Sequence, residues 1–175
     1  EGGRFYLIEA ITAPALRAKA LESDSTLRAQ FGERYERLEG VGSLWALGVW
    51  HASQGDSVVV RSLRDALFAV ELRSHATVAG QLARALSARL LLLRGDTAGA
   101  VTGLRALLTF PVTRAELEWN MGVTLPVERL TLAEILSVRH EWDEADRVAS
   151  AFDHQAPVAF IPFLPASLAL RYRAA

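Results

Sequence analysis

The chain has 175 residues, a formal net charge of -1 and no cysteine. A chain of this length suits one domain with a sizeable core, and the lack of cysteine excludes disulfides, thiolate metal sites and cysteine nucleophiles. Its charges are interspersed without runs of like sign, so they provide no electrostatic footprint for nucleic acid or an anionic lipid surface.

The chain begins with an apolar stretch, which consists of Phe5, Tyr6, Leu7 and Ile8. Residues 12–39 then predict an N-terminal pair of antiparallel helices, because apolar side chains recur there at spacings of three and four. A polar turn at residues 23–25 is expected to join the two helices.

Three later segments repeat one pattern, in which an apolar helical run is followed by a tight turn and a second apolar run. They span residues 42–72, 81–110 and 126–154. The first two turns contain Gly55 with Asp56, and Gly95 with Asp96. Glycine can adopt the left-handed conformation that ends a helix, and aspartate can accept hydrogen bonds from the first N–H groups of the next helix. The sequence therefore predicts three helical hairpins.

A small residue follows each turn and is expected where the second helix of the hairpin approaches the first most closely. Ala100 and Ala145 occupy this place in the second and third segments, and Val60 occupies it in the first. In the third segment Pro126 is expected to begin the first helix, because proline is favoured in the first turn.

The pattern resembles the tetratricopeptide-repeat (TPR) family. The matching residues are Leu47, Gly48, Gly55, Asp56, Gly95, Asp96, Ala100, Trp142 and Ala145. The resemblance covers roughly residues 42 to 154 and implies an all-α, right-handed α-solenoid of antiparallel helical hairpins, forming one domain over residues 1–175. The small residues recur at intervals of 40 and 45 residues, whereas the family period is about 34 residues, so the chain departs from the family pattern.

The last segment, residues 156–175, differs from the repeats. It begins with an apolar stretch in which three prolines forbid one continuous α-helix, and we expect an extended, strand-like segment there. A helix fits after Pro165. By the repeat pattern this is the first helix of a hairpin whose second helix does not follow.

No catalytic, cofactor-binding or metal-binding motif is present. The four histidines lack the close spacings of metal sites, and no phosphate-binding loop or nucleophile elbow occurs. The tripeptide Arg94-Gly95-Asp96 is interpreted as a hairpin turn rather than an integrin-binding motif. The sequence therefore predicts a protein that is not an enzyme and has no cofactor. The most apolar stretch, residues 82–93, is shorter than the ~20 residues of a membrane-spanning helix.

Two tryptophans are less easily placed. Trp45 and Trp50 are five residues apart, so they lie on different faces of one helix and cannot both point into the same hairpin interface. Burial in the core is the usual place for such side chains, and one of the two is a candidate contact with a partner.

The two ends of the chain suggest the leading functional hypothesis. A helical stack without a polar helix at its end exposes an apolar face, and two complementary ends allow head-to-tail assembly. The candidate self-association residues are Phe5, Tyr6, Leu7, Ile8, Phe160, Ile161, Phe163, Leu164, Leu168 and Tyr172. We therefore expect a structural scaffold whose partner is itself, in an extended filament that is extracellular or at the cell surface, with a cytoplasmic location also open. The alternative is a protein-binding TPR-like module from the C-terminal part of a larger multidomain bacterial protein.

Overall fold

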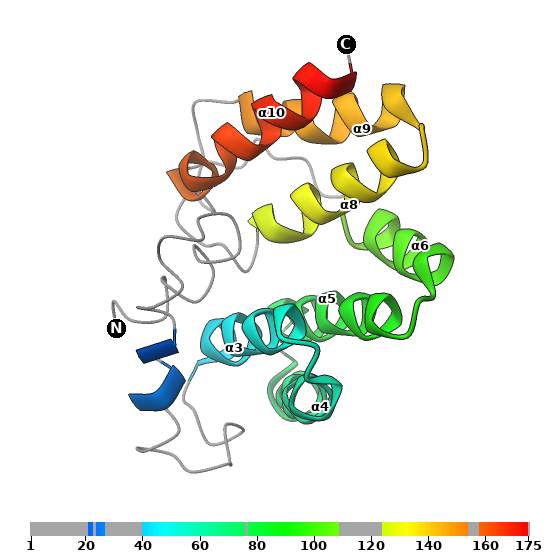
Figure 1. The fold of residues 1–175 in the computed structure, drawn as a ribbon. Helices are drawn as coiled ribbons and strands as arrows, with labels where there is room; N and C mark the ends of the chain where they lie inside the picture. Colours follow the sequence, from blue (N-terminus) through cyan, green and yellow to red (C-terminus); the bar gives the residue numbers. More distant parts are fainter. Residues whose placement is uncertain are drawn as a thin grey trace. The chain divides into compact units, whose positions relative to one another are not determined.

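The computed structural model describes residues 21–22, 24–26, 40–75, 77–108, 124–153 and 158–174. Every regular element in these ranges is a helix, which confirms the predicted all-α class (Figure 1). The chain divides into two compact units, Glu1–Asp96 and Thr97–Ala175. The handedness of the stack and the TPR-like arrangement stay predictions.

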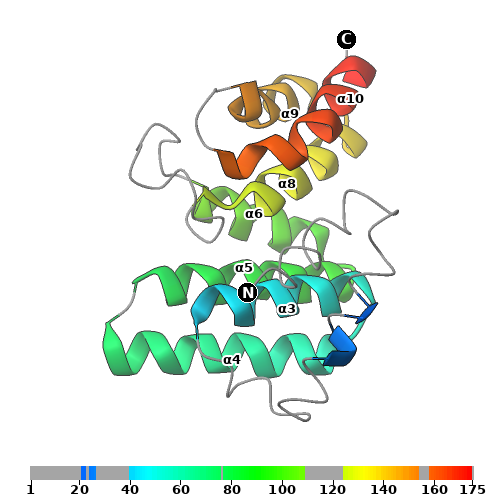
Figure 2. The same ribbon diagram turned by 90° about the vertical axis from the view of Figure 1, so that its left-hand side faces the viewer.

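Three helices form the described core of the first unit. They are α3 (Val41–Ser53), α4 (Ser57–Ser74) and α5 (Thr77–Leu93). Each of the three packs against the other two, and α4 lies beneath the layer that α3 and α5 form (Figure 2). The fully buried leucines at their centre include Leu47, Leu63 and Leu86.

The turn between α3 and α4 has the predicted chemistry. Gly55 adopts a left-handed conformation with φ of 80°, and the Asp56 side chain accepts a hydrogen bond of 3.1 Å from the Val59 amide. The first predicted hairpin is therefore present. The first helix of this hairpin, α3, meets α5 at Gly48, where an added Cβ would lie 2.5 Å from Leu86 Cδ1, so the buried Leu86 side chain would have to shift to admit a larger residue.

Both tryptophans of α3 belong to the core, so neither is exposed for contact with a partner. Trp45 is 2% exposed and Trp50 is 1% exposed. They can lie on different faces and still be buried because every residue from Ser43 to His51 is buried. A helix that is apolar on all sides is typically covered on all sides.

The residues expected to form the N-terminal turn are helical where they are described. Asp24, Ser25 and Thr26 lie in a helix, and the Thr26 hydroxyl donates to the carbonyl of Glu22 one turn earlier. Asp24 is buried, with its carboxylate 3.6 Å from the His51 imidazole. The predicted turn is therefore wrong at Asp24 and Ser25, because Asp24 is held by a tertiary contact that the local sequence does not reveal.

The second predicted hairpin crosses the boundary between the units. Gly95, again with φ of 80°, follows α5, and α6 (Thr97–Leu107) begins after Asp96. Ala100 is buried on α6. The helices and the glycine conformation match the prediction, while the pairing of α5 with α6 stays a prediction.

The second unit contains α6 and a group of later helices. They are α8 (Pro126–Val138), α9 (Trp142–Ala149), the 3₁₀ helices η4 (Ser150–Asp153) and η5 (Val158–Phe163), and α10 (Leu164–Ala174). As expected, α8 begins at Pro126. None of the helices described in either unit combines the length and apolar character that crossing a bilayer requires.

The third predicted hairpin is formed by α8 and α9, which pack closely together. Ala145 on α9 is fully buried, as are Ala133 and Leu136 on α8. A small residue at position 145 lets the two helices approach, as the sequence predicted. On its other side α8 also packs against α6.

The expected strand-like segment is wrong, because residues 158–163 form a 3₁₀ helix with Pro162 inside it. The fixed φ of proline is compatible with a helical backbone, and a short tight helix depends on few N–H donors. Pro165 is the second residue of α10, where its missing N–H removes no hydrogen bond within the helix. The prolines thus separate two helices rather than enforce an extended chain.

Candidate protein-interaction surface

The outward side of α10 carries no charge along most of its length. We call it the α10 outer face, and its exposed residues are Pro165, Leu168, Ala169 and Tyr172 of α10, with Ile161 near the adjoining end of η5. Ile161 is 62% exposed, Leu168 50% and Tyr172 86%. Side chains at spacings of three and four share one face of a helix, so these residues form one apolar stripe.

The opposite side of α10 and the η5 helix before it fix this segment to its own unit. Phe160, Phe163 and Leu170 are buried, and the rings of Phe160 and Phe163 approach that of Phe152 with centroids 4.8 and 6.3 Å apart. The buried Ser167 hydroxyl donates to the Ala149 carbonyl at 2.9 Å. The outer face is therefore the free side of a firmly packed helix.

Two ion pairs add to this attachment. Arg171 donates to Asp146 on α9 at 2.7 Å and to Asp153 on η4 at 2.5 Å. These hydrogen bonds, that to Asp146 first, raise the pKa of Arg171. Arg171 is therefore engaged with its own unit. Arg173, the other charged residue of α10, lies nearer the outer face and has no carboxylate partner among the described residues.

The predicted self-association residues separate into three groups. Ile161, Leu168 and Tyr172 are exposed, and Leu164 is partly exposed. Phe160 and Phe163 are buried, so they belong to the core rather than to the surface. The correction has a simple reason, since an apolar segment must use one side for its own packing. The N-terminal candidates, Phe5, Tyr6, Leu7 and Ile8, lie outside the described residues.

The turn of the third hairpin contains a residue that sequence reasoning passed over. His140 adopts φ of 61° at the place that Gly55 and Gly95 occupy in the other turns. The left-handed conformation is unfavourable for a residue with a Cβ, by roughly 1–2 kcal/mol. Aligning the third turn with the first two, so that His140 stands at the place of Gly55 and Gly95, would have identified His140 as the left-handed residue of its turn.

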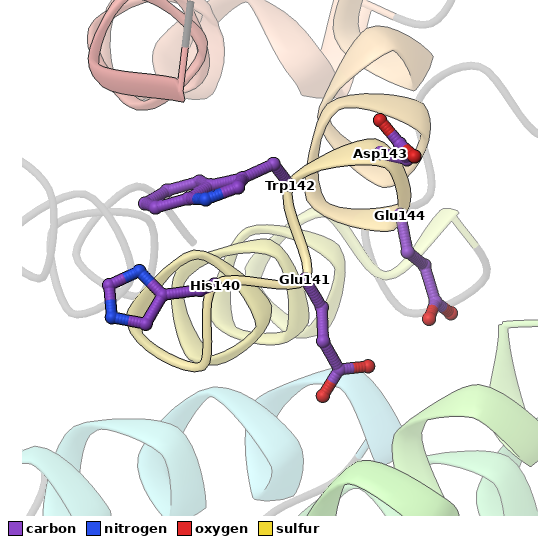
Figure 3. Close-up of a pocket in the computed structure, with 5 residues that line it drawn as sticks. All are labelled: His140, Glu141, Trp142, Asp143 and Glu144. Atoms are coloured by element: carbon purple, nitrogen blue, oxygen red, sulfur yellow. The ribbon is translucent and has the colours of Figure 1, made fainter.

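A shallow pocket of about 300 Å³ lies at this turn. His140, Glu141, Trp142, Asp143 and Glu144 line it, and the rings of His140 and Trp142 lie on the same side of the turn (Figure 3). Their centroids are 5.2 Å apart in an edge-to-face arrangement. The pocket combines an aromatic wall with acidic neighbours, which is a surface suited to cationic groups.

Two of the acidic residues of the pocket, Glu141 and Glu144, are already engaged by arginines of the same unit. Arg105 on α6 donates to both carboxylate oxygens of Glu144, and to Glu141 at 2.8 Å. The bond to Glu144 is the main cause that raises the pKa of Arg105, and it lowers the pKa of Glu144. This network links α6 to the α8–α9 turn, and no local sequence pattern could reveal it, because its members are 36 and 39 residues apart.

The first unit holds one buried histidine between two carboxylates. His51 is 2% exposed, with Nε2 3.6 Å from Asp24 and Nδ1 3.3 Å from Asp56. In the described ranges no three histidine, aspartate or glutamate side chains are arranged to hold a metal ion. The cluster therefore connects the helical residues around Asp24 to the α3–α4 turn.

Comparison with protein-family models, with curated proteins and with solved structures finds no match to this chain. The TPR-like resemblance thus rests on the residues quoted above, and the function has to be argued from the surface of the molecule.

Proposed function

We propose that this chain is a non-enzymatic helical scaffold that binds protein through the α10 outer face, and that its copies assemble head to tail. The observation that carries the proposal is the uncharged, exposed stripe around Leu168 and Tyr172. A helix that is apolar on both sides is typically covered on both sides, and here the protein covers only one.

The position of α10 in its unit supports the same proposal. It packs against α8 and α9, as a further helix added to the preceding hairpin would. In helical repeats each unit buries its sides against its neighbours, so a neighbour on the outer side of α10 completes the arrangement. If a different surface of a second copy supplies this neighbour, the contact is heterologous, and it can extend into a filament.

Oligomeric state tests the proposal directly. Light scattering of the purified chain over a range of concentrations should show a mass that rises with concentration, and electron microscopy should show extended particles. Leu168→Glu should shift the mass to that of a monomer. Val138→Glu is the matched control, because Val138 is 80% exposed on α8 and should leave assembly unchanged. A wild-type chain that stays monomeric at every concentration would remove self-assembly.

The second candidate function is a protein-binding module of a larger protein. The exposed apolar area favours it in one respect, since three large side chains form a smaller patch than most stable interfaces between whole proteins. A monomeric wild-type chain would leave this candidate in place, so the same measurement separates the two functions.

A further inference from the structure

The buried His51 lies between two carboxylates that come from different segments of the first unit. Its Nε2 is 3.6 Å from the Asp24 carboxylate, and its Nδ1 is 3.3 Å from the Asp56 carboxylate. A neutral imidazole has one N–H donor and one acceptor nitrogen, so it can satisfy one carboxylate while its lone pair faces the other. The imidazolium has a donor on each side. The positions of both carboxylates therefore favour the protonated ring.

Among the described residues, the other charge level with this ring comes from α5. The helices α3 and α5 run in the same direction (Figure 2), and Leu86 of α5 packs on Gly48 of α3. One turn further along both helices, Arg89 is in register with His51. Its positive charge and the burial of the ring oppose protonation. Coulomb energy falls with distance, and we expect the two carboxylates, which are within ion-pair distance of the ring nitrogens, to outweigh both.

The two carboxylates differ in what else holds them. Asp56 is the N-cap of α4, where its Oδ1 accepts a hydrogen bond of 3.1 Å from the Val59 amide while its Oδ2 faces His51. Asp56 therefore keeps its place whatever the charge of the ring. Asp24 is buried within the helical residues 24–26, and an ionised carboxylate is unfavourable in such a place unless a compensating charge is near. Loss of the proton from His51 therefore acts mainly on the Asp24 side.

We propose that His51 is a proton-dependent link, in which the imidazolium holds the helical residues around Asp24 against the turn between α3 and α4, and loss of its proton releases them. The two carboxylates are expected to raise the pKa of His51. The stabilisation is then fully present below about 6.5, the ordinary pKa of histidine in an unfolded chain. It is lost as the pH rises through the pKa of the folded protein.

Hydrogen exchange and an NMR titration of the wild-type chain test the link together. The ring of His51 should titrate with a pKa above about 6.5. Amide protection factors of residues 24–26, corrected for the intrinsic effect of pH on exchange, should fall over the same pH range. For a folded pKa one above the ordinary value, the loss should be about tenfold. Protection that does not change with pH, or a ring that titrates below about 6.5, would overturn the proposal.

A conservative substitution of the carboxylate separates charge from packing. Asp24→Asn keeps the size of the side chain but removes its charge, so the protection of residues 24–26 should no longer depend on pH. His75→Asn is the matched control, because His75 is exposed at the end of α4 in a left-handed conformation that asparagine tolerates. The pH dependence should persist in this control. A pH dependence that persists in Asp24→Asn, or that disappears in His75→Asn, contradicts the assignment to this pair.

Replacement of the ring provides a second readout that follows the whole first unit. His51→Gln retains a donor and an acceptor but cannot take up a proton. The difference in unfolding free energy between wild type and His51→Gln, measured with urea, should therefore be larger at about pH 6 than at about pH 9. An equal difference at both values would assign His51 to packing and would overturn the link.

Discussion

Two helices of the second unit, α8 and α10, are built alike and differ in what covers them. Both begin close to a proline and both have a buried apolar side. Leu132 and Leu136 on α8 are almost completely buried, whereas Leu168 and Tyr172 on α10 remain open to solvent. The second side of α8 is covered within the unit and the second side of α10 is not. An apolar helical pattern therefore predicts that a neighbour covers the helix, but it does not identify that neighbour.

The largest effect should follow from opening a cavity on the covered helix. Leu136→Ala removes a fully buried side chain and should lower the free energy of unfolding by about 2–5 kcal/mol, measured by chemical denaturation of the second unit's transition. Leu168→Ala on α10, measured at a concentration where the chain is monomeric, should cost less than about 1.5 kcal/mol because half of that side chain is already exposed. Equal losses would mean that α10 is covered within the monomer.

Enlarging the close contact between α8 and α9 should have the next largest effect. Ala145 is fully buried, so Ala145→Leu should destabilise the unit by about 1–3 kcal/mol through overpacking. Ala169→Leu on the α10 outer face is the matched change and should leave the melting temperature of the monomer almost unaltered. A destabilising Ala169→Leu would indicate a neighbour that the proposal does not include.

The turn between α8 and α9 should become more stable when its strain is removed. His140→Gly frees the left-handed position and should raise the free energy of unfolding by up to about 1 kcal/mol, reduced by the loss of the ring contact with Trp142. Thermal unfolding measures the change. The reverse kind of substitution, Gly55→Ala at φ of 80°, should destabilise the first unit. Changes of the same sign in the free energy of unfolding for His140→Gly and Gly55→Ala would contradict this explanation.

The smallest effect concerns the ion pair between α6 and α9. Since the bond to Arg105 lowers the pKa of Glu144, the stabilisation is present above the unfolded value of about 4.3 and is lost as the pH falls through the folded value. The contribution should be about 0.2–1 kcal/mol, because the pair is exposed. The difference in unfolding free energy between Arg105→Ala and wild type should be smaller at pH 3 than at pH 7; an equal difference at both would assign the role of Arg105 to packing.

Local chemistry explains which parts of the fold the sequence could predict. The left-handed glycines at 55 and 95 and the start of α8 at Pro126 were found where expected, because each depends on residues within one turn. The burial of both Trp45 and Trp50 and the bond between Arg105 and Glu144 depend on what other segments place nearby. These features could not be predicted from spacing alone.

The candidate surface shows the same division. The sequence identified the apolar C-terminal segment, yet it could not separate Phe160 and Phe163, which face the core, from Leu168 and Tyr172, which face solvent. That separation follows from the 3₁₀ helix before Leu164, which sets the rotation of the segment about its axis. The apolar character of the segment was therefore predictable, but the side of the helix on which each apolar residue lies was not.

The central claim is that a second copy covers the α10 outer face. Because the chain has no cysteine, Leu168→Cys introduces a single thiol. After the protein has been reduced, the rate at which this thiol reacts with a thiol reagent measures how accessible the α10 outer face is. The account predicts that this rate falls as protein concentration rises, while the rate for Thr102→Cys, at an exposed position on α6, stays constant. A rate for Leu168→Cys that does not change with concentration would contradict it.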